Sequence, residues 1–169
     1  GRNFSKREIL SEAFNMRCEK ISFNQNDAII LKYYIKKNDL FNSIDSETSS
    51  LKYLLNKFPK LFPSIKYSSQ DLLIIEFINN NNIKYKNYQE VLAKEILKLH
   101  KITNDKYGFD FDAQIGGLKQ TNEFETNWVN FFAEKRLNMI FEIINKSNPM
   151  PNSINKKINN LLNNLENYI

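Results

Sequence analysis

A lysine and a glutamate lie on faces of their predicted elements that are otherwise apolar. Lys32 lies in the middle of residues 27–35, Asp-Ala-Ile-Ile-Leu-Lys-Tyr-Tyr-Ile, whose β-branched and aromatic residues predict a strand. Glu47 precedes Leu51 by four residues and Leu54 by seven, so it shares the apolar stripe of a predicted helix. A charge on a buried face is unfavourable unless it is paired. We therefore expect Lys32 and Glu47 to form an ion pair.

This pair has a chemical interpretation and a structural alternative. A strand lysine held by a carboxylate of the following helix is the arrangement with which protein kinases hold the α- and β-phosphates of ATP. In the alternative, Glu47 lies at the edge of its helix and Lys32 extends its ammonium to water. The spacing of the two residues favours neither interpretation over the other.

The elements that would position the pair follow from apolar periodicity and from proline. A helix is predicted over 43–58 because its apolar residues recur at spacings of three and four, and Pro59 ends it. The other predicted elements of this half are a turn at 38–41, strands over 65–67 and 72–78, an asparagine-rich loop at 79–82 and an amphipathic helix over about 89–101.

Only helices are predicted after a glycine-rich window. Asn122 and Glu125 have the spacing of a capping box, which predicts a helix that continues to about 148 and carries aromatic residues on one face. A last amphipathic helix is predicted over 154–165. Strands first and helices afterwards predict an α+β protein with two lobes, residues 1–79 and 80–169.

The glycine-rich window carries the most specific pattern of the chain. Residues 107–137 contain three of the four glycines and the only tryptophan, Trp128. The order Tyr-Gly-Phe, Ile-Gly, Gln-x-Asn and Trp-x-x-Phe-Phe-x-x-x-Arg-Leu resembles the fructosamine (ketosamine) kinase family, small-molecule kinases related to the aminoglycoside phosphotransferases. The resemblance implies a protein-kinase-like fold, with an antiparallel-sheet, ATP-binding small lobe that contains one helix. The first helices of an incomplete helical large lobe would follow.

The resemblance also suggests roles for particular residues. Residues 46–51, Ser-Glu-Thr-Ser-Ser-Leu, are similar to the family's helix motif, so Lys32 would position phosphates and Glu47 would orient Lys32. Residues 73–78 are similar to the strand that leads into the kinase hinge, so the backbone near Glu76, Phe77 and Ile78 would receive adenine. Ser11, in a segment similar to the family's Asn-Glu-Ala-Tyr, would contact phosphate.

The activity implied is transfer of the γ-phosphate of ATP, with Mg²⁺, to a sugar hydroxyl of a ketosamine. Two features depart from the kinase pattern. No glycine lies between Gly1 and Gly108, so a Gly-x-Gly-x-x-Gly loop is absent, and so is a His-Gly-Asp-x-x-x-x-Asn motif. We therefore expect the catalytic base and the metal ligands beyond Ile169, and no phosphotransferase activity from this chain alone.

Composition sets the remaining expectations. The net charge of +5 admits nucleic acid as a partner, but the lysines are dispersed along the chain, so we do not expect nucleic acid as a partner. The single cysteine, Cys18, allows no internal disulfide and is expected as a small buried side chain. With no apolar run of membrane-spanning length, the protein is expected in the cytoplasm. The alternatives to a kinase are a non-catalytic α+β interaction module and a basic RNA-associated protein.

Overall fold

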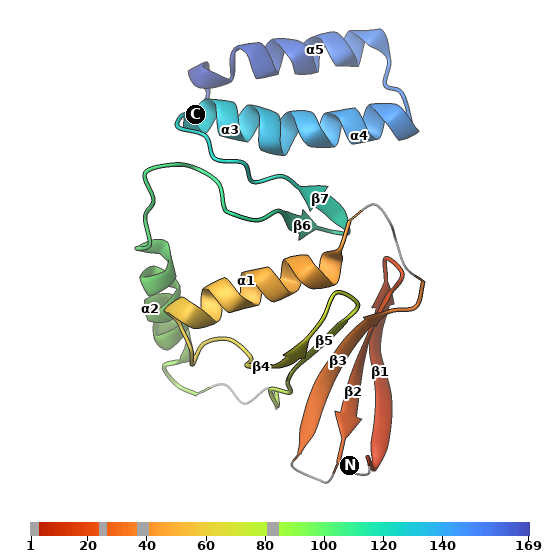
Figure 1. Cartoon of the computed structure of the whole chain (residues 1–169). Helices are drawn as coiled ribbons and strands as arrows, with labels where there is room; N and C mark the ends of the chain where they lie inside the picture. The colour runs from red at the N-terminus through yellow and green to blue at the C-terminus, as the bar shows by residue number, and fades with distance from the viewer. Residues whose placement is uncertain (1–3, 24–26, 37–40, 81–84) are drawn as a thin grey trace. The chain divides into compact units, whose positions relative to one another are not determined.

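The protein is described by a computed structural model that covers residues 4–23, 27–36, 41–80 and 85–169. It divides into two compact units, unit 1 (Gly1–Ile102) and unit 2 (Thr103–Ile169), drawn in Figure 1. Compactness thus places a division after residue 102, and the predicted boundary between lobes at residues 79 and 80 stays a prediction. The predicted turn at 38–41 and the asparagine-rich tract at 79–82 lie largely outside the described residues.

Unit 1 is built on a five-stranded antiparallel sheet with the strand order β1-β2-β3-β5-β4. The strands are β1 (Lys6–Ala13), β2 (Met16–Ser22), β3 (Ala28–Tyr34), β4 (Ile65–Ser68) and β5 (Leu72–Glu76); helix α1 (Ser43–Lys57) joins β3 to β4, and helix α2 (Tyr88–His100) follows β5. The last three strands and both helices confirm the predicted elements. Strands β1 and β2 add a hairpin that the sequence pattern does not predict.

The core of unit 1 lies between α1 and one face of the sheet (Figure 1). The sheet contributes Ile30, Leu73 and Ile75 to this core, and α1 contributes Ile44 and Leu51. Leu73 and Ile44 are completely buried. The apolar stripe predicted for the helix therefore packs on the face of the sheet that carries alternate residues of β3 and β5.

The β1–β2 hairpin joins the sheet with little apolar burial on its outer strand. Its turn consists of Phe14 and Asn15, both with positive φ (52° and 61°), as a two-residue type I′ turn requires. A bulge interrupts the ladder between Ile9 and Ser11. Every residue of edge strand β1 is exposed. Apolar burial therefore contributes little to the attachment of β1.

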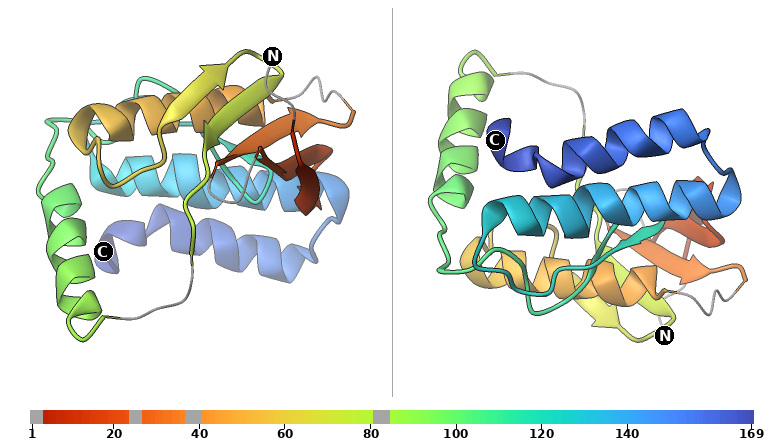
Figure 2. Two further views of the ribbon diagram at one scale, coloured as in Figure 1. Left: turned by 90° about the horizontal axis from the view of Figure 1, so that it is seen from below. Right: turned by 90° about the horizontal axis from the view of Figure 1, so that it is seen from above.

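Unit 2 contains a short hairpin followed by helices. Its elements are β6 (Ala113–Ile115), β7 (Leu118–Gln120), α3 (Trp128–Phe132), a π-helical segment (Ala133–Asn138), α4 (Met139–Ser147), α5 (Asn152–Asn163) and a 3₁₀ turn (Leu165–Asn167). Helices α3 and α4 run on through the π-helical segment, and α5 runs back alongside them (Figure 2). The hairpin turn consists of Gly116 and Gly117, with φ of 54° and 79°.

The predicted capping box at Asn122 and Glu125 is wrong. The helix begins six residues after Asn122, at Trp128, where the side chain of Asn127 accepts a hydrogen bond from the Asn130 amide. Glu125 instead pairs its backbone with that of Tyr107. Asn122 is buried and has tertiary partners, which removes it from the cap. The predicted last helix is confirmed as α5.

Gly108 explains part of the glycine-rich window. Its φ is +132°, and a Cβ atom built on it would lie 2.5 Å from the carbonyl oxygen of Asn122. Glycine is therefore required there both by backbone conformation and by close approach of a second segment.

Candidate functional site

The predicted ion pair between Lys32 and Glu47 is present. The Lys32 ammonium on β3 donates a hydrogen bond of 2.5 Å to Oε1 of Glu47 on α1. The two side chains are 21% and 24% exposed, so the pair lies at the edge of the core rather than in water. The alternative in which both groups extend to solvent is wrong. The Lys32 side chain is thus paired but not fully buried.

The start of α1 fixes where Glu47 lies. Asn42 caps the helix, because its Oδ1 atom accepts from the Asp45 amide at 2.9 Å. The same oxygen accepts from the Tyr34 hydroxyl at 3.0 Å, and that hydroxyl in turn accepts from the Ile44 amide at 3.2 Å. Since Tyr34 lies on β3, two residues after Lys32, this contact ties the helix to the strand that carries the lysine.

Ser11 lies in the same cross-strand row as Lys32. Ser11 pairs with Cys18, Cys18 pairs with Lys32 and Lys32 pairs with Leu73, so the four side chains share one face of the sheet. Burial raises the pKa of the Cys18 thiol, against smaller opposing effects from the Lys32 charge and a hydrogen bond with Ser11. Cys18 packs against the core, partly buried as a small side chain. The row brings an exposed hydroxyl to the face that carries the lysine ammonium.

The predicted hinge residues lie at the end of β5 and differ in their environments. The Glu76 amide donates to the carbonyl of Ser64, and the Glu76 carboxylate accepts from the Ser64 amide and hydroxyl. The hydroxyl hydrogen bond is the larger of two effects of Ser64 that lower the pKa of Glu76. Ile78 is 58% exposed, and Phe77 packs against the core. The Glu76 side chain is thus held by Ser64, which directly precedes β4, and the predicted adenine contact at Glu76, Phe77 and Ile78 stays a prediction.

Lys20 is a residue of this face that sequence reasoning missed. Its ammonium lies 3.8 Å from the centroid of the Phe77 ring, a cation–π contact. Lys20 pairs with Ile30, and Ile30 pairs with Ile75, so this row lies beside the row of Lys32 and on the same face. Lys20 stands in a strand without clear alternation, and no signal in the sequence distinguishes it from the other lysines.

Unit 2 carries a polar network around Asn122, which is 2% exposed. Arg136 donates to Oδ1 of Asn122 at 2.6 Å and to the carbonyl of Thr121 at 2.9 Å. The Asn122 amide group donates to the carbonyl of Phe111, and its backbone amide donates to Asp112. A hydrogen bond from Lys119 is the main cause of a lowered pKa of Asp112, whereas burial lowers the pKa of Arg136. Asn122 of the Gln-x-Asn motif and Arg136 of the Arg-Leu motif therefore make structural contacts with each other.

The aromatic residues of the window form one cluster. The Trp128 ring stacks on Phe132 at 5.4 Å between centroids, and Tyr107 lies 5.3 Å from Trp128. Phe131 is buried beneath them, while Trp128 is 43% exposed. Phe124, predicted on the aromatic face of the helix, precedes the helix instead.

The described segments contain neither a metal-binding cluster nor a membrane-spanning helix. Within residues 4–23, 27–36, 41–80 and 85–169, no group of three or more His, Cys, Asp or Glu side chains is arranged to hold a metal ion. Over the same residues, the helices are too short or too polar to cross a membrane.

The fold and the site define a class of protein. An antiparallel five-stranded sheet whose third strand carries a lysine paired to a glutamate of the following helix is the small-lobe arrangement of the protein-kinase-like phosphotransferases. The sequence profile described as fructosamine kinase matches residues 17–169. The chain belongs to the fructosamine kinase family.

Curated relatives agree with this assignment, and a solved structure agrees with the fold. The chain is 23% identical over 117 residues to a "Probable ketoamine kinase" of Lactiplantibacillus plantarum, covering 66% of this chain and 40% of the relative. It is 33% identical over 67 residues to the chloroplastic protein-ribulosamine 3-kinase of Arabidopsis thaliana, covering 38% and 20%. A solved structure titled "Putative fructosamine-3-kinase" from Haemophilus somnus superposes with a TM-score of 0.79 at 22% identity, over 99% of this chain and 57% of that one. The chain therefore spans about two fifths of the first relative and somewhat more than half of the solved structure.

Proposed function

We propose that the whole protein transfers the γ-phosphate of ATP to a sugar hydroxyl of a ketosamine, and that unit 1 of this chain supplies its nucleotide-binding small lobe. The observation that carries the proposal is the Lys32–Glu47 pair at the edge of the core, with Ser11 in the same row of the sheet. Family membership and the names of the relatives support the acceptor class.

In this proposal each residue of the site has a separate task. The Lys32 ammonium holds the α- and β-phosphates, and Glu47 keeps that ammonium oriented. The Ser11 hydroxyl donates to a phosphate oxygen. The backbone of Phe77 and Ile78 faces the base, with Lys20 beside it. No chemical step is assigned to these residues, because they bind and orient ATP and do not take the proton from the acceptor hydroxyl.

Mg²⁺ belongs to the proposal through ATP, whose phosphates it bridges in kinases and whose developing charge it neutralises. No residue of this chain is assigned as its ligand, because the described residues contain no suitable cluster of carboxylates. The acceptor is proposed as a small glycated amine. The alternatives of an interaction module and of an RNA-associated protein receive no support from the family match.

The proposal is tested with two samples. The chain is titrated with ATP by calorimetry, as wild type, as Lys32→Met and as Lys52→Met, a control that removes an exposed lysine of α1. Losing one charged hydrogen-bond donor should weaken ATP binding by about 10- to 100-fold in Lys32→Met. Lys52→Met should bind as wild type.

The second sample is the full-length protein, incubated with ATP, Mg²⁺ and fructoselysine and analysed by mass spectrometry for a phosphorylated sugar. Equal ATP affinity of both lysine variants would reject the assigned nucleotide site. Absence of a phosphorylated product from a range of ketosamines would reject the acceptor class.

A further inference from the structure

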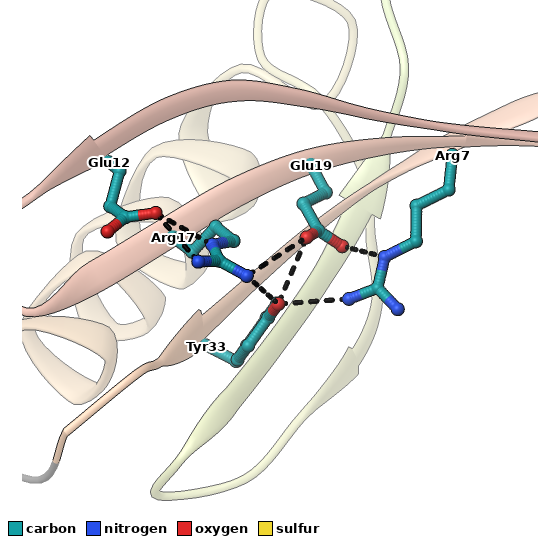
Figure 3. Close-up of polar contacts among 5 residues, drawn as sticks. All are labelled: Arg7, Glu12, Arg17, Glu19 and Tyr33. Atoms are coloured by element: carbon teal, nitrogen blue, oxygen red, sulfur yellow. Dashed lines mark hydrogen bonds and ion pairs between the residues drawn. The ribbon is translucent and has the colours of Figure 1, made fainter.

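Five polar side chains form a connected cluster, as Figure 3 shows: Arg7, Glu12, Arg17, Glu19 and Tyr33. We call them the arginine–glutamate cluster. Strand register places this cluster on the face of the sheet opposite to Lys32. Glu19 is its centre and is only 1% exposed. Its Oε2 atom accepts from Nε of Arg7 at 2.5 Å, and its Oε1 atom accepts from the Tyr33 hydroxyl at 3.0 Å.

The remaining contacts close the cluster into a network. Tyr33 accepts at its hydroxyl from Nη2 of Arg7 at 2.9 Å and from Nη1 of Arg17 at 3.4 Å. Arg17 also donates to Oε2 of Glu12 through Nε at 2.9 Å and pairs with that oxygen through Nη2 at 2.8 Å. The hydrogen bond from Arg7 is the main reason why the pKa of Glu19 is lowered, so Glu19 is a buried carboxylate that stays charged.

The arginine–glutamate cluster lies on the same three strands that carry Ser11 and Lys32 on their other face. Arg7 and Glu12 lie on β1, Arg17 and Glu19 on β2, and Tyr33 on β3 (Figure 3). Tyr33 directly follows Lys32 in the strand, so the two side chains lie on opposite faces of the same sheet. A change of register or tilt between β2 and β3 would move Ser11 on β1 and Cys18 on β2 relative to Lys32 on β3.

The hairpin needs such an attachment. Every residue of β1 is exposed, β1 carries a bulge, and the turn contains no glycine that would let it fold over a ligand. Glycine-rich loops of protein kinases close over the phosphates. Because the β1–β2 turn has no glycine, we expect the hairpin to hold the Ser11 hydroxyl in one position rather than to close over the phosphates.

We propose that the arginine–glutamate cluster holds the β1–β2 hairpin in fixed register against β3, and that Glu19 is thereby a positioning residue for the phosphate end of the bound nucleotide. This inference rests on the proposed function. Glu19 acts from the far side of the sheet and does not touch the ligand. Its effect reaches the ligand through the placement of Ser11 and of the turn.

The test compares Glu19→Ala and the milder Tyr33→Phe with Glu90→Ala. Glu90 is a matched control because its ion pair with Lys94, at 2.6 Å, lies within α2 and is exposed. Amide hydrogen exchange is measured in the whole chain, and the dissociation constants of ATP and adenosine are measured by calorimetry. Glu19→Ala should speed exchange in β1 and β2 at least tenfold while the core amides of β3 and β5 keep their protection, as expected for local opening.

The ligand comparison separates positioning from a general loss of folding. ATP affinity should fall about five- to twentyfold in Glu19→Ala, the loss of roughly one positioned hydrogen bond, while adenosine affinity stays unchanged. Tyr33→Phe should give a smaller loss in the same direction, and Glu90→Ala none. Equal losses for ATP and adenosine, or wild-type exchange in β1 and β2, would overturn the proposal.

The proposed function fails in a different way. If the wild-type chain binds neither ATP nor adenosine, the nucleotide site of unit 1 is rejected, and with it the positioning role of Glu19. The exchange measurement then still decides whether the cluster holds the hairpin.

Discussion

The Lys32–Glu47 pair makes a quantitative prediction about unit 1. Exposed ion pairs contribute about 0–1 kcal/mol, whereas removing one partner of a fully buried pair destabilises by about 3–5 kcal/mol. With side chains that are 21% and 24% exposed, this pair lies between the two cases. Glu47→Gln should therefore lower the free energy of unfolding of unit 1 by about 1–2 kcal/mol, since the amide keeps a hydrogen-bond acceptor but loses the charge.

A double-mutant cycle isolates the interaction from the other effects of each substitution. Lys32→Met, Glu47→Gln and the double variant should give a coupling energy of about 1 kcal/mol, with the double variant less destabilised than the sum of the single ones. The core amides of β3 and β5 report the unfolding of unit 1 by hydrogen exchange. Tryptophan fluorescence does not serve here, because the only tryptophan, Trp128, lies in unit 2.

The prediction is wrong if the destabilisations caused by Lys32→Met and Glu47→Gln simply add in the double variant. A coupling energy below about 0.3 kcal/mol would mean that the two groups do not interact in solution, whatever their distance in the structure. Lys52→Met combined with Glu47→Gln is the control cycle and should be additive, because Lys52 is an exposed lysine of the same helix.

Three further predictions concern other parts of the chain. Gly108→Ala should destabilise unit 2 by about 2–4 kcal/mol, because its φ of +132° and the nearby Asn122 carbonyl both exclude a Cβ; tryptophan fluorescence during urea unfolding measures this, and an unchanged midpoint would contradict it. Because the Arg7 hydrogen bond lowers the pKa of Glu19 in the folded state, its stabilisation is complete above the ordinary value of 4.5 and is lost as the pH falls through the lowered pKa; exchange of unit 1 amides at pH 3 and pH 6 should show this loss, and equal protection would argue against it. The raised pKa of Cys18 should make its thiol react slowly with iodoacetamide at pH 7 and faster in urea, and a native rate equal to the denatured rate would disprove it.

The sequence was sufficient for features that depend on local periodicity. The apolar stripe of α1 and the β-branched composition of β3 predicted both elements, and the two charges on those apolar faces predicted the Lys32–Glu47 pair. The two elements were predicted from residues within each element. The ion pair was predicted from the rule that a charge on a buried face needs a partner. The glycine-rich window predicted special backbone geometry, and Gly108 has it.

Features that depend on contacts between distant segments were missed. Strand β1 has no buried side chain and a bulge, so its residues lack the alternation by which strands are recognised. Glu19 is buried by side chains 12 and 14 residues away, which no local pattern connects to it. Asn122 and Glu125 match a capping box in spacing, but Arg136 and Phe111 take Asn122 as a tertiary partner. Asn122 therefore makes tertiary hydrogen bonds instead of capping a helix.

The π-helical segment Ala133–Asn138 interrupts an otherwise α-helical rod between α3 and α4. Each residue of an α-helix turns the chain by about 100°, so the widened turn accommodates one additional residue and reorients everything after it. A helix can accommodate one more residue in such a widened turn without breaking. Arg136 lies inside it, where its guanidinium reaches Thr121 and Asn122. Removing one codon there would restore a regular helix and turn the apolar side of α4 by about a quarter of a revolution, away from the contacts it now makes with its own unit.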